Sequence, residues 1–145
     1  ISLHTIYHID KDKQAEAVRK LIKVTKPGKP IIIVYSNPNA FTSLITPWKL
    51  LRIIKSLIFK DTVPSIYFFA HPNKWWNQFS DQAEVKLYPW RSFSSLYQKI
   101  LIPNNSIGNS LLKKLYALEE KYPNFFVNNF QYPMIVLTKK NNIKV

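Results

Sequence analysis

The sequence of 145 residues contains no cysteine and only two glycines, Gly28 and Gly108. The lack of cysteine excludes disulfides and thiolate metal sites. Two isolated glycines exclude a glycine-rich phosphate loop of the dinucleotide-binding or P-loop kind. The longest apolar runs, Ile31–Tyr35 and Ile66–Ala70, fall far short of the roughly 20 residues that a membrane-spanning helix needs. What is present is enough apolar and aromatic sequence for one domain with one hydrophobic core.

Acidic residues are also few, and the formal charge is +13. Eighteen lysines but only three arginines carry the positive charge. Because arginine is preferred for bidentate phosphate and base contacts, its scarcity argues against a dedicated nucleic-acid interface. The abundance of lysine, asparagine and isoleucine is typical of an A+T-biased genome. We interpret the charge as a solvated lysine surface, with a nucleic acid or an anionic membrane surface as the alternative partners.

The most informative stretch runs from residue 10 to residue 36. Asp10 or Asp12 is expected to cap a helix whose apolar residues recur every three or four positions, up to a stop at Pro27-Gly28. The run Pro30–Ser36 follows, and its apolar residues on both faces are typical of a central parallel strand. A helix, a tight turn and a buried strand form the second half of a β-α-β unit. The pattern therefore predicts an α/β fold.

The rest of the chain alternates between shorter strands and helices. In order, the patterns predict a strand end within Ile1–Ile9, a helix over Thr46–Lys60, a strand over Ile66–Ala70, a short helix containing Trp75, Trp76 and Phe79, a strand over Glu84–Tyr88, helices over Phe93–Ile100 and Ile107–Tyr122, and a strand over Tyr132–Leu137.

Three parts of the first quarter resemble one known family. Residues 4–9 (HTIYHI) look like the apolar-aromatic-histidine-apolar pattern that follows the fourth strand in class I S-adenosylmethionine-dependent methyltransferases. Residues 24–29 (VTKPGK) are similar to that family's L-K-P-G-G turn, with Lys29 in place of the second glycine. Ile31–Tyr35 then corresponds to the fifth strand.

Downstream segments follow in the family's order, without specific motifs. Glu84–Tyr88, the helix to Tyr122, and Tyr132–Leu137 correspond to the sixth strand, the intervening helix and the antiparallel seventh strand. The resemblance implies an α/β fold that is the C-terminal half of a doubly wound methyltransferase-type sheet. It would comprise strands four to seven, the last of them antiparallel, with a helical insert.

The family's cofactor loop, D/E-x-G-x-G after the first strand, has no counterpart in this sequence. We therefore expect residues 1–145 to be a single partial domain, with 1–37 and 83–139 as the sheet core and 38–82 as an inserted lid. Such a fragment would not bind S-adenosylmethionine or be active without the rest of its parent enzyme. Since the chain starts at Ile1 inside an apolar stretch, we expect its natural N-terminus upstream. The exposed fourth strand predicts self-association.

In open parallel sheets, ligands bind beyond the carboxyl ends of the strands. By the resemblance, Leu3 and His4 line the methionine end of the cofactor, and His8 is our candidate general base. The candidates for substrate contact are Tyr7, Asn37, His71 and Arg91. Packing or capping is the alternative role for His8, a structural role is the alternative for His71, and packing is the alternative for Tyr7. A surface ion pair is the alternative for Arg91. The histidines lack metal-ligand spacing, so we predict no metal.

The sequence leaves three functions open. The first is methyl transfer to a small or lipid-like acceptor by a cytoplasmic enzyme. The second is methylation of RNA or protein, for which the basic surface would be the substrate track. The third is a non-catalytic module that lies on anionic membrane through Pro47–Lys60.

Overall fold

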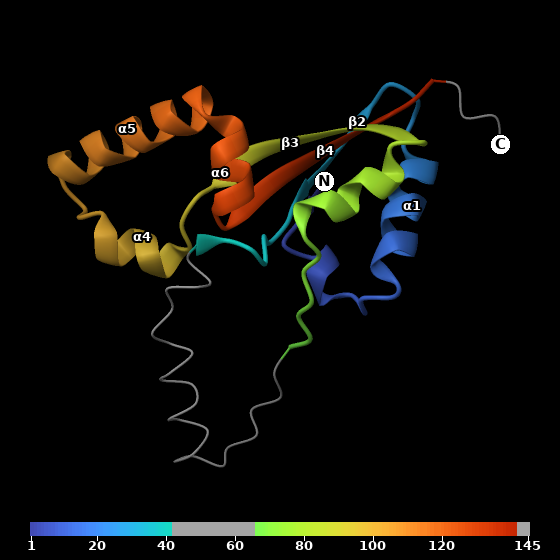
Figure 1. Ribbon diagram of the computed structural model, residues 1–145, viewed down its shortest axis with the longest axis horizontal. Helices are drawn as coiled ribbons and strands as arrows, with labels where there is room; N and C mark the ends of the chain where they lie inside the picture. The colour runs from blue at the N-terminus through green and yellow to red at the C-terminus, as the bar shows by residue number, and fades with distance from the viewer. Residues whose placement is uncertain (42–65, 142–145) are drawn as a thin grey trace, which may run out of the picture.

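The computed structural model describes residues 1–41 and 66–141 (Figure 1). In chain order, the described elements are β1 (Ser2–Leu3), the 3-10 helix η1 (Ile6–His8), α1 (Gln14–Val24), β2 (Pro30–Val34), the 3-10 helix η2 (Asn73–Phe79), β3 (Ala83–Arg91), α4 (Ser95–Leu101), α5 (Ser106–Lys121), α6 (Pro123–Asn129) and β4 (Tyr132–Lys139). The predicted helix over 46–60 lies outside the described residues.

The strands form one sheet in the order β1-β2-β4-β3. Strand β2 pairs in parallel with β1 and antiparallel with β4, and β4 is also antiparallel to β3. The carboxyl ends of β1, β2 and β3 therefore meet at the same edge as the amino end of β4. The prediction that Ile31–Tyr35 forms an interior strand with a parallel neighbour is confirmed.

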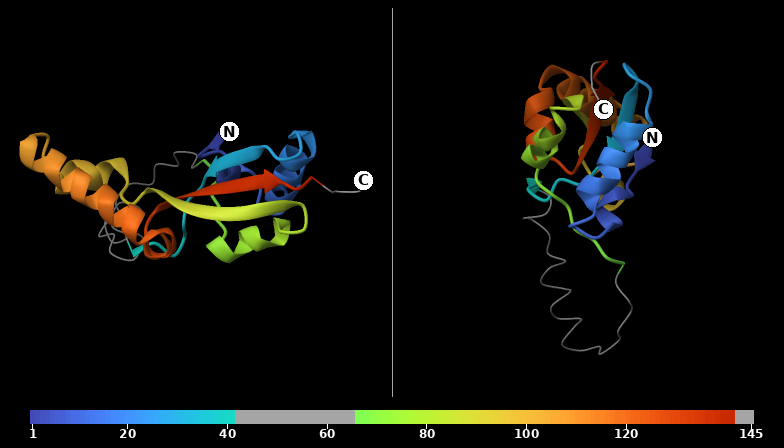
Figure 2. Two further views of the ribbon diagram at one scale, coloured as in Figure 1. Left: turned by 90° about the horizontal axis from the view of Figure 1, so that it is seen from above. Right: turned by 90° about the vertical axis from the view of Figure 1, so that its right-hand side faces the viewer.

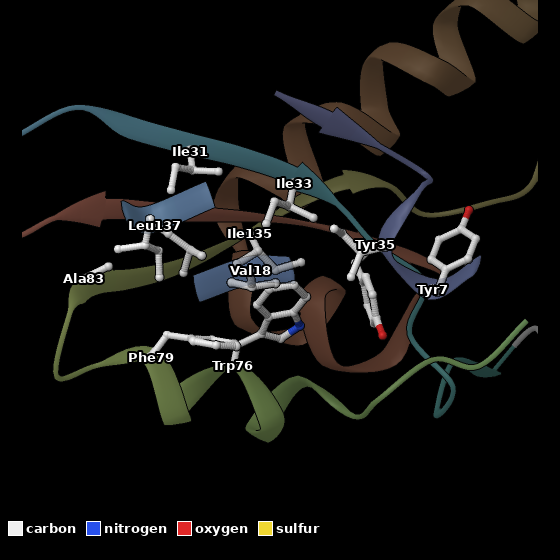
Figure 3. Close-up of a cluster of buried hydrophobic side chains, with 12 residues drawn as sticks. Tyr7, Val18, Ile31, Ile33, Tyr35, Trp76, Phe79, Ala83, Ile135 and Leu137 are labelled. Carbon is white, nitrogen blue, oxygen red and sulfur yellow. The ribbon is translucent and has the colours of Figure 1, made fainter. Parts of the chain in front are cut away.

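The hydrophobic core lies against one face of this sheet (Figure 3). It is built on alternate residues of β2 and β4, where Ile31 pairs with Leu137 and Ile33 pairs with Ile135. The core is completed by Val18 and Ile22 from α1, Trp76 and Phe79 from η2, and Ala83 at the start of β3. Each large apolar side chain buried in this way contributes about 1.5 to 3 kcal/mol. Helix α1 and η2 thus hold β2 and β4 in place.

Helix α1 ends as the sequence predicts but begins differently. Gly28 adopts a φ of 72°, and its amide donates to the carbonyl of Lys139 over 2.8 Å. This left-handed conformation is open to glycine without strain. The prediction that an aspartate caps the helix is wrong, because Lys13 is the N-cap residue and makes no side-chain cap bond. Asp10 instead accepts from the amide of Asp12 in a turn that precedes the helix.

Three other expectations need correction. Ile66–Ala70 is not a strand but a mostly exposed loop. Strand β3 does not end at Tyr88: it runs on through Pro89, which pairs opposite Pro133. A proline is tolerated there because β3 is the edge strand of the described sheet. Helix α6 was not foreseen, although Pro123 at its first turn is a typical helix-start residue.

Helices α4 and α5 project away from the end of the sheet, beyond β3 (Figures 1 and 2). Along the 16 residues of α5, only Gly108 and Glu119 are buried. Helix α6 returns the chain to the sheet and contacts β3. With α5 it borders a cavity of about 790 Å³ whose sheet side includes Lys86, Tyr88 and Met134. The outer helices therefore leave open space next to the sheet.

The predicted lid over 38–82 is described only in part. Within it, Trp76 and Phe79 of η2 are fully buried in the core, so this part of the segment packs as an extension of the core. The role of residues 42–65 stays a prediction. No helix in the described ranges is long and apolar enough to cross a membrane.

Candidate functional site

The carboxyl edge of the sheet gathers side chains from the ends of β1, β3 and β4 and from η1, and we call His4, Tyr7, Arg91 and Tyr132 the rim cluster. His4 directly follows β1, and its amide donates to the carbonyl of Val34 over 3.1 Å. Arg91 ends β3 and pairs in register with Tyr132, the first residue of β4. Cross-strand partners have neighbouring side chains. The rim cluster thus joins residues separated by more than a hundred positions in the sequence.

His4 occupies the centre of the rim cluster. Its ring meets that of Tyr132 edge-on with centroids 4.9 Å apart, and its Nδ1 lies 2.8 Å from the hydroxyl of Tyr7. Burial lowers the pKa of His4, and the charges of Arg91 and His8 lower it further. The imidazole is therefore neutral at neutral pH, with its Nδ1 engaged by the Tyr7 hydroxyl.

The backbone of His4 is strained. Its φ of 55° is the single positive value at a non-glycine residue within the described ranges. A bulky side chain in the left-handed region costs about 1 kcal/mol or more and persists only where the surroundings enforce it. Such strain is often found at binding sites. The conformation turns the chain sharply between β1 and η1, and this turn brings Tyr7 back onto the His4 ring.

The two phenols of the rim cluster stay protonated over the physiological range. Burial raises the pKa of Tyr7 to about 12, and the neighbouring Tyr132 adds to this shift. Burial also raises the pKa of Tyr132, while the charge of Arg91 acts in the opposite direction. Both hydroxyls are therefore hydrogen-bond donors rather than anions, and Arg91 is the group that carries a full charge.

The guanidinium of Arg91 has only neutral partners. Its Nη2 donates to Ser95 Oγ over 2.8 Å and to Gln98 Oε1 over 3.4 Å. The ion pairs of the described residues are Lys20 with Glu16 and Lys86 with Glu84, so the predicted alternative of a surface ion pair does not occur for Arg91 within those ranges. A half-buried cation without a counterion is suited to bind an anionic group.

The other two histidines lie outside the rim cluster, but His8 borders it: its ring meets that of Tyr7 edge-on with centroids 4.6 Å apart. His8 is exposed on η1, and its Nδ1 lies 2.8 Å from the carbonyl oxygen of Tyr67, to which it donates. Its Nε2 is left as a free acceptor. His71 stacks flat on Trp75 with ring centroids 4.3 Å apart, and burial lowers its pKa. Its Nε2 is buried and has no hydrogen-bond partner among residues 1–41 and 66–141.

Of the two remaining candidates, Asn37 is buried and Leu3 is exposed. Asn37 is only 3% exposed, and its amide nitrogen lies 3.0 to 3.3 Å from the carbonyl oxygens of Val127, Asn128 and Phe130. Those contacts connect the segment after β2 to the end of α6. They also occupy the side-chain N–H groups of Asn37, which a substrate would need as donors. Leu3 is 54% exposed. It is therefore accessible at the free edge of β1.

Tyr132 is the rim residue that sequence reasoning missed. Its signal was nevertheless present, because an antiparallel last strand brings its first residue to the carboxyl edge of its neighbours. No group of three or more histidine, cysteine or acidic residues in the described ranges could hold a metal ion.

Comparison with known proteins bears on the fold. No protein-family model and no curated protein matches the chain. Among solved structures, a SAM-dependent methyltransferase from Archaeoglobus fulgidus superposes with a TM-score of 0.51 at 17% sequence identity. The likeness is one of fold. It covers 95% of this chain and 57% of that structure, so the chain spans little more than half of its structural neighbour. The α/β fold of this chain, with its four-stranded mixed sheet and its helices, is thus compatible with part of a methyltransferase-like fold.

Proposed function

We propose that this chain is the acceptor-binding half of a class I S-adenosylmethionine-dependent methyltransferase. The observation that carries the proposal is the sheet order β1-β2-β4-β3 with β4 reversed against both neighbours. It agrees with the expectation of four strands of which the last along the chain is antiparallel to its neighbours. The fold likeness to a SAM-dependent methyltransferase supports it.

The rim cluster by itself does not fit the cofactor. S-adenosylmethionine carries a carboxylate, which a guanidinium could bind, but also a sulfonium and an ammonium, and both of these favour a carboxylate or a negative dipole nearby. The rim cluster offers a guanidinium, a neutral imidazole and two protonated phenols, with no carboxylate among them. We therefore derive no step through the cofactor here. The proposal requires a glycine-containing loop from chain outside these residues, with Leu3 and His4 as a border of the cofactor site.

The guanidinium and a protonated phenol group of the rim cluster are suited to bind the methyl acceptor. Arg91 and the hydroxyl of Tyr132 can donate to an anionic or polar group, and only one charged residue is involved. A nucleic-acid track would need several cationic phosphate contacts side by side. The rim cluster therefore favours a small or lipid-like acceptor over RNA. The membrane-surface alternative depends on residues 47–60, which lie outside the described ranges.

Of the three histidines, His8 is the best placed to remove a proton. His4 has its Nδ1 occupied by the Tyr7 hydroxyl, and the free nitrogen of His71 is buried. His8 is exposed, and its contact with the Tyr67 carbonyl leaves Nε2 free to accept. We propose His8 as the general base where the acceptor needs one, with His4 as a positioning residue for Tyr7 and Tyr132.

The test uses the complete polypeptide that contains this chain. Isothermal titration with S-adenosylmethionine should show binding, and methyl transfer from labelled cofactor should fall at least about tenfold in His8→Asn. Residues 1–145 alone serve as the control and should bind no cofactor. If the complete polypeptide binds neither S-adenosylmethionine nor its demethylated product, the assignment is wrong. Transfer that collapses with added salt would indicate a nucleic-acid acceptor instead.

The free edge of β1 is the second feature to test. Ser2 and Leu3 pair only with β2 within the described residues, and backbone groups at an unpaired edge can bond to another strand. We propose that residues 1–145 alone self-associate through this edge. A concentration-independent monomer mass by light scattering would contradict this.

A further inference from the structure

A second cavity, of about 220 Å³, lies between the end of β3 and the helices α4 and α5. Its walls are apolar where Ile102, Leu112 and Leu115 line it. Two side chains of the charged types also line it, Arg91 from the rim cluster and Glu119 from α5. Because these groups come from different elements and face one small space, the cavity combines a cation, a carboxyl group and an apolar wall.

Glu119 is placed at a cost to the fold. It is 7% exposed, and it accepts a short hydrogen bond from the hydroxyl of Ser92. No cation pairs with it within the described residues, since the ion pairs there involve Glu16 and Glu84. A buried carboxyl group without a cation is unfavourable. Its place in the last turn of α5 adds to this cost, because the helix dipole disfavours negative charge there.

Arg91 is a cation without an acidic partner among the described residues, as Glu119 is an acidic residue without a cation. Its two hydrogen bonds to Ser95 and Gln98 both use Nη2. The remaining donors, on Nη1 and Nε, have no partner among the described residues. Although Arg91 and Glu119 border the same cavity, they do not pair with each other within 4.0 Å. Two opposite charges held apart across a small apolar space are what a zwitterion needs on its two ends.

We propose that this cavity binds a small zwitterion with an apolar side chain, of the aliphatic amino-acid class. Its carboxylate would bind Arg91, its ammonium would bind Glu119 and its side chain would contact Leu112 and Leu115. The cavity lies well under the roughly 300 to 1,000 Å³ of sites for drug-sized ligands, so it fits a ligand smaller than a nucleotide or a phospholipid. That this zwitterion binds in the cavity is independent of the proposed function. That it is also the methyl acceptor rests on the proposed function.

The experiment titrates residues 1–145 with leucine, leucinamide and 4-methylpentanoate by NMR chemical-shift perturbation, without cofactor. Leucinamide lacks the carboxylate and 4-methylpentanoate lacks the amine. Leucine should bind at least tenfold more tightly than either analogue. Arg91→Gln and Glu119→Gln should each weaken leucine binding about tenfold or more. Arg19→Gln and Glu120→Gln change exposed residues of the same types and should leave it unchanged.

The variants also assign each end of the ligand. Arg91→Gln should have no effect on the weak binding of leucinamide, and Glu119→Gln should not weaken 4-methylpentanoate. Far-UV circular dichroism checks that each variant is folded. Equal binding of all three compounds, no binding of leucine at millimolar concentration, or unchanged leucine affinity in Glu119→Gln would each overturn the proposal. Since no cofactor is present, failure here is distinct from failure of the methyltransferase assignment.

Discussion

Replacing Tyr35 with phenylalanine should destabilise the fold by breaking a buried polar network. The Tyr35 hydroxyl donates to Gln14 Oε1 over 2.7 Å and accepts from the amide of His71 over 3.1 Å. The amide nitrogen of Gln14 in turn donates to the carbonyls of Ile9 and Phe69. Burial raises the pKa of Tyr35 to about 12, so the hydroxyl keeps its proton. One oxygen atom thus ties β2 to α1 and to the loop before η2.

The magnitude follows from the two groups that would lose their partner. Gln14 Oε1 is sealed from water, because Gln14 and Tyr35 are both 0% exposed. A buried polar group left unpaired costs about 1 to 3 kcal/mol. Since water reaches the half-buried His71 more easily, we expect Tyr35→Phe to lose roughly 2 to 4 kcal/mol of unfolding free energy. A domain of this size has about 5 to 15 kcal/mol in total.

Urea denaturation followed by tryptophan fluorescence measures this loss. The Trp76 ring lies edge-on to Tyr35 with centroids 5.0 Å apart, so it reports on the same region. The midpoint should fall by about 1 M or more, with an unchanged slope. Tyr116→Phe, at a side chain that is 53% exposed, is the control and should change stability by less than about 0.5 kcal/mol. A loss in Tyr35→Phe as small as in this control would refute the network's role.

Three further predictions concern other contacts. A Cβ at Gly108 would lie 1.7 Å from the Pro103 carbonyl oxygen, so Gly108→Ala should lower the unfolding free energy by about 1 to 3 kcal/mol or more in urea denaturation. Asn37→Ala should lower it by about 2 to 4 kcal/mol in the same assay, because three carbonyls of the α6 end lose a buried donor. The NMR titration midpoint of His4 should lie below 6.5 and rise in Arg91→Gln, because a nearby positive charge disfavours the imidazolium. Since unfolding restores the ordinary pKa, the stability from neutral His4 is present above pH 6.5 and is lost as the pH falls through the folded pKa, which acid titration of the urea midpoint can follow.

Local patterns predicted the central strand of the sheet well, because a strand that is buried on both faces consists of consecutive apolar residues. The run Ile31–Tyr35 is β-branched and apolar throughout, and the structure makes it the interior strand β2. Ile66–Ala70 is equally apolar yet forms a loop. Composition cannot separate the two segments, because only the first has neighbouring strands on both sides.

The site was harder to predict because its groups meet through long-range contacts. The sequence pointed to His8 and Arg91 as single residues. It did not show that Tyr7 contacts His4, because this contact depends on the left-handed backbone of His4, which no sequence pattern signals. Glu119 reads as an ordinary charge in an exposed helix. Its burial against Ser92 arises only because α5 crosses the end of β3.

The direction of β4 decides what kind of chemistry the rim can have. Because β4 runs against β2 and β3, its first residue, Tyr132, lies beside Arg91, and Lys139 lies at the far edge opposite Ala83. A parallel β4 would reverse this, placing a lysine next to Arg91 and carrying Tyr132 away from the His4 ring. The rim would then hold two neighbouring cations and would suit a polyanion. The reversed strand instead leaves one guanidinium among protonated phenols, an arrangement that favours a single anionic group over a polyanion.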